Sequence, residues 1–184
     1  WFLIMEFLEG DELRVVLEKN KTLPIARVLG ILSQAAIGLD GAHRSGAVHR
    51  DLKPDNIFLV DTGSGDRVKV LDFGSVKFTK GQDKGQKLTV MGTTIGSPFY
   101  MSPEQARGAA DLDHRTDVWA LGAIVYEMTV GRVPFSAANG PQILFKILGE
   151  EPMPPSFAND SAPPQVDDFI TRALAKKKED RFPS

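Results

Sequence analysis

The feature that most constrains the fold is the run DVWALGAIVYEMTVG, residues 117–131, which is apolar on nearly every side. A helix that is apolar around its whole circumference is stable only when other elements surround it, so we expect it in the middle of the domain. Gly131 and Pro134 should end it, because glycine favours the position after a helix and proline cannot continue one. The rest of the chain must then form a shell around this helix.

Composition limits the classes of function. The chain has 184 residues, 42% hydrophobic and 25% charged, which suits one globular domain. A formal net charge of -2 offers no basic surface for nucleic acid, so we expect no nucleic-acid partner. The absence of cysteine excludes disulfides and thiolate metal sites, and agrees with a cytoplasmic location. The runs WFLIM and VWALGAIVY are too short to span a bilayer, so we expect no membrane contact from this segment.

Further helices are predicted by apolar residues spaced three and four apart. Residues 23–46 form one such helix, with a stripe of Ile25, Val28, Leu32, Ala35, Ala36 and Leu39. Residues 163–178 form another, with a stripe of Val166, Phe169, Ile170, Ala173 and Leu174 and a solvated end at the lysines 176–178. Residues 139–151 are a third candidate. Residues 1–7, WFLIMEF, predict a buried strand that stops before Gly10.

A β-hairpin is predicted by the segments NIFLV and RVKVLDF on either side of the turn sequence DTGSGD. Asn56 stands just before its first strand and Asp72 just after its second. Because antiparallel strands return the chain to its starting edge, these two residues should be neighbours although sixteen positions apart. Their oxygen atoms suit a hard divalent cation such as Mg²⁺.

The loop HRDLKPDN, residues 49–56, carries five ionisable groups between two apolar segments. Charges held near a core need a partner or a function. Pro54 disfavours a helix at Lys53, so this loop should stay extended. The carboxylate of Asp51 could orient an attacking hydroxyl, and the ammonium of Lys53 could offset developing phosphate charge. Together with the two oxygen ligands of the hairpin, this set suits phosphoryl transfer.

HRDLKPDN, DFG and SPE occur in this order, and they resemble the catalytic loop, the metal loop and the end of the activation segment of protein kinases. DVWALG and the arginine of EDRFPS resemble two further signature positions. The resemblance covers essentially the whole chain. It implies a eukaryotic-type (Hanks-type) serine/threonine protein kinase, and SPEQARG resembles its bacterial members. The implied fold class is mainly α (α+β), a kinase-like C-terminal lobe in which a helical bundle carries a small β-hairpin.

The resemblance also implies domain boundaries. Residues 1–12 would be the last strand of the N-terminal lobe and the hinge, and residues 13–184 the C-terminal lobe with its final helix truncated. The remaining N-terminal lobe, with its glycine-rich loop and strand lysine, would be absent from this chain. We therefore expect the 184-residue chain alone to be weakly active or inactive, and its uncovered apolar edge to favour aggregation.

Roles in catalysis follow from the resemblance residue by residue. Asp51 would be the catalytic base, and Lys53 would contact the transferred phosphate of ATP. Asn56 and Asp72 would hold Mg²⁺ or Mn²⁺ against that nucleotide. Around the adenosine part of ATP, Met5 would be the gatekeeper, and the backbone groups of Glu6 and Leu8 would bond adenine. Glu12 would lie near the ribose, and Phe58 would form the floor under adenine.

Structural and regulatory roles follow in the same way. His49 would stack under Phe73, Glu104 would pair with Arg181, and Asp117 would brace the catalytic loop. Arg50 would receive a phosphorylated threonine of the activation segment through charge-assisted hydrogen bonds. The candidate threonines are Thr89, Thr93 and Thr94, with Thr89 favoured. Ser97, in the substrate groove, and Lys53 indicate serine/threonine specificity. His43 and His114 are expected at the surface or at helix ends.

The implied partners are protein substrates with serine or threonine hydroxyls, including the kinase itself through autophosphorylation. Two alternatives stay open. A small-molecule kinase of similar fold would usually lack a segment such as GSPFYMSPEQARG, which shapes a groove for protein substrates. A pseudokinase-like binding module would not need the intact Asp51, Lys53, Asn56 and Asp72. The kinase domain would be cytoplasmic, within a parent protein that could be membrane-anchored.

Overall fold

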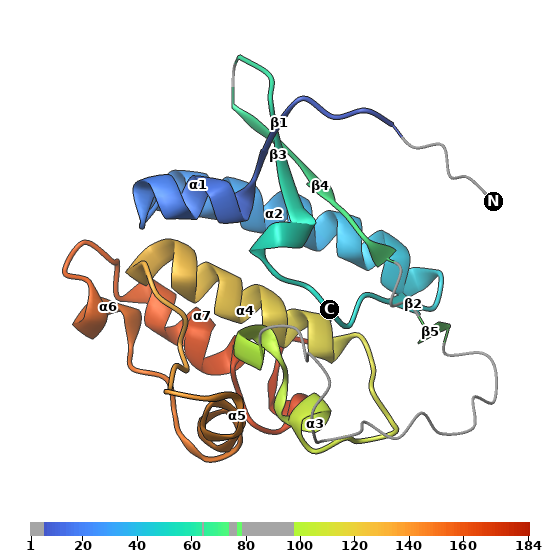
Figure 1. Ribbon diagram of the computed structural model, residues 1–184, viewed down its shortest axis with the longest axis vertical. Helices are drawn as coiled ribbons and strands as arrows, with labels where there is room; N and C mark the ends of the chain where they lie inside the picture. The colour runs from blue at the N-terminus through green and yellow to red at the C-terminus, as the bar shows by residue number, and fades with distance from the viewer. Residues whose placement is uncertain (1–5, 64, 74–76, 79–97) are drawn as a thin grey trace.

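The computed structural model describes residues 6–63, 65–73, 77–78 and 98–184. Its α-helices are α1 Leu13–Asn20, α2 Ile25–Arg44, α3 Pro103–Ala106, α4 Arg115–Val130, α5 Gly140–Gly149, α6 Pro155–Ala158 and α7 Gln165–Ala173. Its strands are β1 Gly10–Glu12, β2 Ala47–Val48, β3 Ile57–Asp61, β4 Asp66–Val70 and β5 Lys77–Phe78. Short 3-10 helices cover η1 Pro54–Asn56, η3 Pro98–Tyr100 and η4 Lys178–Asp180. The helices form one body, from which the β3–β4 hairpin projects (Figure 1).

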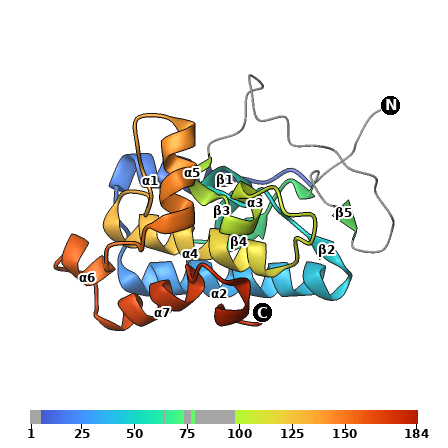
Figure 2. The same ribbon diagram turned by 90° about the horizontal axis from the view of Figure 1, so that it is seen from below.

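Helix α4 lies at the centre, as its all-round apolar sequence predicts. Thirteen of its sixteen residues are buried, and Figure 2 shows α2 and α7 running close to it. Gly131 ends it in the left-handed conformation, with φ 81°. Gly122 packs directly against the end of α7. A Cβ added there would lie 2.7 Å from the Cβ of Ala173, so only glycine fits this contact.

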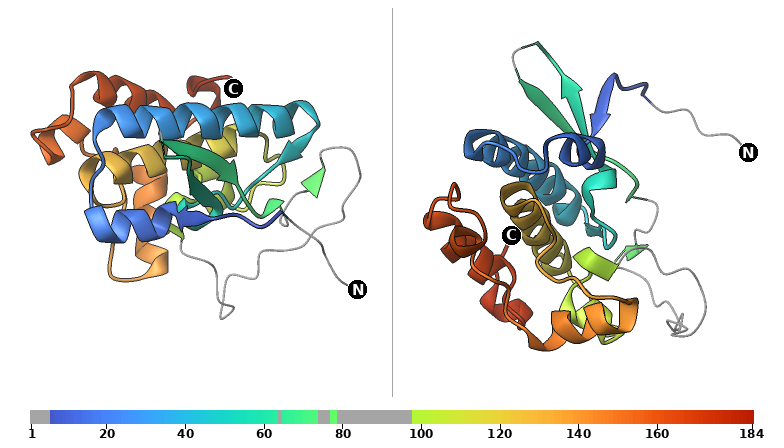
Figure 3. Two further views of the ribbon diagram at one scale, coloured as in Figure 1. Left: turned by 90° about the horizontal axis from the view of Figure 1, so that it is seen from above. Right: turned by 60° about the vertical axis from the view of Figure 1, so that its left-hand side comes forward.

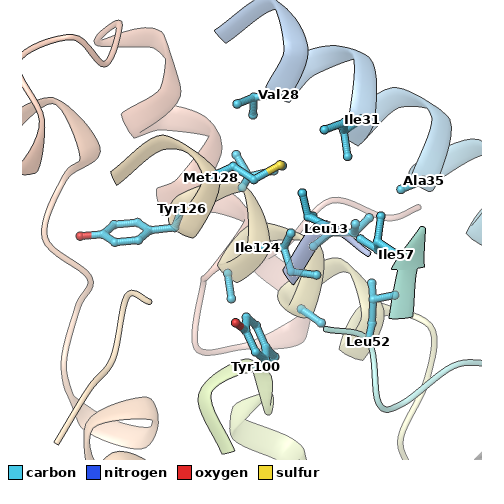
Figure 4. Packing of buried hydrophobic residues seen from close by; sticks show 14 of the residues in the cluster. Leu13, Val28, Ile31, Ala35, Leu52, Ile57, Tyr100, Ile124, Tyr126 and Met128 are labelled. Atoms are coloured by element: carbon cyan, nitrogen blue, oxygen red, sulfur yellow. The ribbon is translucent and has the colours of Figure 1, made fainter. Parts of the chain in front are cut away.

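Buried side chains from most elements meet around α4 in a single core. Leu13 of α1, Val28 and Ile31 of α2, and Ile57 of β3 point toward Ile124 and Met128 of α4 (Figure 4). Of the predicted α2 stripe, Val28, Ala35 and Leu39 are buried, and Ile25 and Leu32 are partly buried. Ala36 is exposed and Ile31 takes its place, because the 3.6-residue period of the helix turns position 36 away from α4.

Helix α2 fastens the hairpin to the helical body. The guanidinium of Arg27 donates to both carboxylate oxygens of Asp66, at 2.7 and 2.9 Å. The amide of Gln34 donates to the carbonyl of Asp66 at 2.9 Å and accepts from the N–H of Val68 at 3.1 Å. In the part of the chain that the structure describes, α2 is long and apolar enough to cross a membrane by length and composition alone. One face of α2, with Val28, Ile31, Ala35 and Leu39, is buried, and the helix contacts α4 and β4.

The sheet has three antiparallel strands in the order β1-β3-β4. The hairpin register pairs Ile57 with Val70 and Asp61 with Asp66, which confirms the predicted hairpin and its turn. Figure 3 shows this sheet packed along one side of α2. Strand β2 pairs with β5 as a separate two-stranded ladder.

Two expectations about elements are wrong, and one helix was not predicted. A strand was predicted over residues 1–7, but Glu6 and Phe7 are not in a strand, and Phe7 is 87% exposed. Residues 1–5 lie outside the described residues. Strand β1 begins at Gly10 instead, where the backbone pairs with β3. Helix α1 was not anticipated, although four of its eight residues are apolar and Leu13, Val16 and Leu17 are buried. Helix α7 ends at Ala173, so the lysines at 176–178 are not its solvated end.

Lys176 and Lys178 have specific partners instead. The Nζ of Lys176 donates to the carbonyl of Ile147 at 3.0 Å and lies over the rings of Trp119 and Phe135. The Nζ of Lys178 binds Asp111 at 2.9 Å. The segment after α7 is thereby tied back to the body of the fold.

Candidate active site

The loop between β2 and η1 places Asp51 at the surface and its neighbours in the core. Leu52 and Pro54 are buried, whereas the side chain of Asp51 is 54% exposed. One carboxylate oxygen of Asp51 accepts from the Nζ of Lys53 at 3.2 Å. The carboxylate of Asp51 and the ammonium of Lys53 therefore lie side by side at the surface, on a loop that the buried Leu52 and Pro54 hold to the core.

Asn56 fixes the shape of this loop. Its side-chain Nδ2 donates to the backbone carbonyl of Asp51 at 2.8 Å, and the residue is 5% exposed. Because the nitrogen of this amide is used by the loop, the oxygen Oδ1 is the atom that can act as a ligand.

The hairpin brings Asp72 to the same edge. The N–H of Leu71 donates to the carbonyl of Asn56 at 2.8 Å, directly beyond the pair Ile57 and Val70. Asp72 follows with a φ of 55° and an exposed side chain, so the chain turns sharply at this point. The amide of Asn56 and the carboxylate of Asp72 offer the oxygen donors that Mg²⁺ or Mn²⁺ prefers, so the chemistry of these residues fits such an ion.

His49 connects the two halves of the site. Its Nε2 lies 2.8 Å from the carbonyl of Leu71, so it must donate, and its Nδ1 then accepts the N–H of Asp51 at 3.3 Å. The ring is fully buried and lies 4.9 Å from the ring of Phe73. His49 thus ties the backbone of Asp51 to the residue before Asp72. Its ring contacts that of Phe73 as expected, but the two rings are tilted by 60° and not stacked.

Asp117 holds the start of the loop from α4. Its Oδ1 accepts the N–H of Arg50 and its Oδ2 the N–H of His49, both at 2.9 Å. The Nε of Arg50 is buried and has no hydrogen-bond partner among the described residues. This leaves Arg50 with a donor suited to an anion.

Glu104 of α3 and Arg181, directly after η4, form an ion pair. Arg181 donates to both carboxylate oxygens of Glu104 at 2.7 Å, and both residues are buried. Burial alone would raise the pKa of Glu104, but the hydrogen bonds and charge of Arg181 outweigh it and hold that pKa below its ordinary value.

Of the residues expected to meet the nucleotide, Glu12 and Phe58 lie on adjacent strands, and Glu6 and Leu8 lie before β1. Glu12 of β1 is the register partner of Phe58 of β3, and Phe58 in turn faces Lys69 of β4. The carboxylate of Glu6 lies 3.0 Å from the Nζ of Lys69, and Leu8 is partly buried just before β1. The remaining predicted site residues lie outside the described residues: Met5, Thr89, Thr93, Thr94 and Ser97.

Comparison with known proteins agrees with this geometry. The family described as protein kinase domain matches residues 1–183. The chain belongs to the protein kinase family. This family in general uses ATP and a divalent metal ion.

Several proteins similar to this chain are bacterial serine/threonine kinases. It is 43% identical over 183 residues to serine/threonine-protein kinase pkn3 of Myxococcus xanthus, covering 98% of this chain and 33% of that protein. It is 42% identical over 184 residues to serine/threonine-protein kinase Pkn1 of the same organism, covering 100% of this chain and 26% of that protein. It is 33% identical over 181 residues to serine/threonine-protein kinase PknB of Mycobacterium tuberculosis, covering 98% of this chain and 28% of that protein. The chain therefore spans about a third or less of the length of these relatives.

Some residues that shape this candidate site were missed or misjudged from the sequence. His43 does stand at a helix end, but its side chain is only 10% exposed, with Nε2 2.7 Å from Asp117. A histidine one turn before a loop gives no pattern that reveals this contact. Gln105, which donates to the carbonyl of Arg50 at 2.7 Å, was not singled out. The S-x-x-Q spacing of a capping box from Ser102 was the available signal.

A polar cluster joining α1, η3 and α4 was also missed. Arg14 donates to Glu127 at 2.8 Å and to the hydroxyl of Tyr100, which itself donates to Glu127. Burial raises the pKa of Tyr100, and the nearby Glu127 raises it further, so Tyr100 keeps its proton for this network. The cluster fixes η3, the first described element after residue 97, against the central helix.

Proposed function

We propose that this chain is the part of a serine/threonine protein kinase that transfers the γ-phosphoryl group of ATP to serine or threonine hydroxyls of proteins. One observation carries the proposal: the hydrogen bonds of Asn56 to the Asp51 carbonyl and of Leu71 to the Asn56 carbonyl. They support a single site that contains the carboxylate of Asp51, the ammonium of Lys53 and the two oxygen ligands of Asn56 and Asp72. Bacterial relatives named as serine/threonine kinases support the same activity.

The chemistry assigned to each group follows from its position. The substrate hydroxyl oxygen attacks the γ-phosphorus, the bond from that phosphorus to the bridging oxygen breaks, and ADP leaves. Asp51, exposed and next to Lys53, accepts the hydroxyl proton. The ammonium of Lys53 offsets negative charge on the transferred group. Asn56 and Asp72 would hold the divalent ion, which neutralises phosphate charge when bound.

Regulation is proposed at Arg50. Its buried Nε lacks a partner among the described residues, and a guanidinium in this state favours an anion. A phosphate on Thr89, Thr93 or Thr94 would supply one, in line with control by phosphorylation of the activation segment.

We assign residues 1–12 to the end of the N-terminal lobe, with its last strand, and the hinge, and residues 13–184 to the C-terminal lobe. Adenosine would lie against Phe58 and Glu12, whose register pairing brings them together. The substrates would be proteins, including other copies of the kinase. Because its donor is ATP, we propose that the domain works in the cytoplasm.

The test uses the full-length protein that contains this chain, with radiolabelled ATP and a generic protein substrate. We expect label on serine and threonine in the wild type and its loss in Asp51→Asn, which keeps the size of the side chain but cannot accept the proton. The control is Asp61→Asn, at the far end of the same hairpin. Label on a small molecule alone would instead favour a small-molecule kinase. Signalling that persists in Asp51→Asn without any label would favour a binding module.

A further inference from the structure

The backbone of Arg50 adopts a conformation that is unfavourable for a residue with a side chain. Its φ is 67°, in the left-handed region that residues with a side chain rarely adopt. It lies directly before Asp51, so the direction of its peptide bond sets where the Asp51 carboxylate points. Such a conformation persists only where surrounding contacts hold it in place.

The N–H side of Arg50 is held through Asp117, which is itself held by His43. The carboxylate of Asp117 is fully buried and accepts the N–H groups of Arg50 and His49. The Nε2 of His43, at the end of α2, lies 2.7 Å from Oδ2 of Asp117. Because a carboxylate only accepts, His43 donates here. The His43 ring also lies 5.4 Å from the ring of His114, which restricts its rotation.

The C=O side of Arg50 is held by Gln105. Its Nε2 donates to the carbonyl of Arg50 at 2.7 Å. Its Oε1 accepts from the N–H of Ser102 at 3.0 Å and lies 3.2 Å from the Ser102 hydroxyl. Ser102 is fully buried at the start of α3. The amide of Gln105 is therefore fixed at its oxygen end and presents its nitrogen to the loop.

We propose that His43 and Gln105 are positioning residues that clamp the Arg50 backbone from opposite sides and thereby aim Asp51. Neither touches the reacting atoms, since each acts on the Arg50 peptide groups, His43 through Asp117. The inference rests on the proposed function, because the aim of Asp51 matters only if Asp51 takes part in phosphoryl transfer. It also links the end of the activation segment directly to the catalytic loop.

Substitutions can separate this role from a purely structural one. Gln105→Glu keeps the oxygen that caps Ser102 but places an acceptor against the Arg50 carbonyl, whereas Gln105→Met loses both contacts. His43→Gln keeps a donor at the position of Nε2, and His43→Met removes it at similar size. Gln34→Glu is the matched control. Gln34 also donates to a carbonyl and accepts an N–H, but it does so at the hairpin turn.

Full-length protein is assayed for kcat, for KM of ATP, for Tm and for amide hydrogen exchange over residues 48–52. We expect kcat to fall about tenfold to a hundredfold in His43→Met and Gln105→Glu, because small misplacements of a catalytic group have costs of this size. KM for ATP and the Tm of Gln105→Glu should stay near wild type, while exchange over residues 48–52 rises. His43→Gln should restore kcat, and Gln34→Glu should leave it unchanged.

Two results overturn the clamp. One is a wild-type kcat with unchanged exchange in both His43→Met and Gln105→Glu. The other is a loss of kcat that follows the loss of Tm across all variants, Gln34→Glu included, which marks a structural role only. If the wild type itself transfers no phosphate, the proposed function fails, and exchange over residues 48–52 alone still decides whether the clamp exists.

Discussion

Arg181 and Glu104 face each other as a bidentate ion pair, with both N···O distances at 2.7 Å, although 77 positions separate them in the chain. The same guanidinium donates to the carbonyls of Ala175 and Arg115. One side chain therefore joins the start of α3, the start of α4 and the segment after α7. This junction supports the helix that presents Gln105 to the catalytic loop.

Removing one partner of this pair should strongly destabilise the protein. In Arg181→Met the buried carboxylate of Glu104 keeps the hydroxyl of Thr116 as its remaining side-chain donor, and the expected loss is about 3–5 kcal/mol. The double variant Glu104→Gln with Arg181→Met should lose less than the sum of the two single variants. Urea unfolding of all four proteins measures this coupling, and strictly additive losses would contradict it.

The same pair predicts an acid dependence. The pKa of Glu104 is lowered in the folded protein, so the folded state favours the charged carboxylate. Its contribution to stability is fully present above the unfolded pKa of about 4.3 and is lost as pH falls through the lower, folded value. The difference in unfolding free energy between wild type and Glu104→Gln should therefore shrink as the pH falls from about 6 to about 3. A difference that stays constant over that range would show that the charge of Glu104 does not matter.

Lys176 predicts a dependence of the opposite kind at alkaline pH. Burial lowers its pKa to about 8, below the unfolded value of about 10.4. Between these values the unfolded chain binds more protons, so the stability of the wild type should rise with pH. Relative to Lys176→Met, the wild type should gain stability from about pH 8 to about pH 10 in urea unfolding. A flat difference would place the Lys176 ammonium in water and not over Trp119.

Two helix glycines should respond oppositely to alanine. At Gly122 the new Cβ would lie 2.7 Å from Ala173 and 3.1 Å from Leu174, so α4 and α7 must move apart at a cost of about 1–3 kcal/mol. At Gly30, in α2, no atom lies within 4 Å of such a Cβ. Gly30→Ala should stabilise the protein by about 0.5–1 kcal/mol, since alanine is the better helix former. Equal Tm shifts in the two variants would refute the tight α4–α7 contact.

The sequence predicted those parts of the molecule that local pattern and chain reversal determine. The apolar circumference of residues 117–131 predicted a central helix, and the two strand segments on either side of DTGSGD predicted a hairpin, which returns Leu71 to Asn56. The kinase resemblance named Glu104 with Arg181, and His49 with Phe73, and the structure brings each pair together.

What the sequence did not reveal depends on long-range packing. The contacts of His43 with Asp117 and of Gln105 with Arg50 join residues 74 and 55 positions apart, and neither has a periodic signal. Lys176 was assigned to a solvated helix end because its position over Trp119 depends on where α7 stops. The strand predicted at residues 1–7 failed at Phe7, since apolar composition alone does not supply a strand to pair with.

The most direct test of the account is the Mg²⁺ dependence of phosphoryl transfer from ATP in the full-length protein carrying Asp72→Asn, with Asp61→Asn as control. If Asp51, Asn56 and Asp72 form one site, Asp72→Asn should lower the rate at least about a hundredfold at limiting Mg²⁺ and raise the Mg²⁺ concentration needed for half-maximal rate. Asp61→Asn should behave as wild type. A wild-type rate and Mg²⁺ dependence in Asp72→Asn would contradict the central claim.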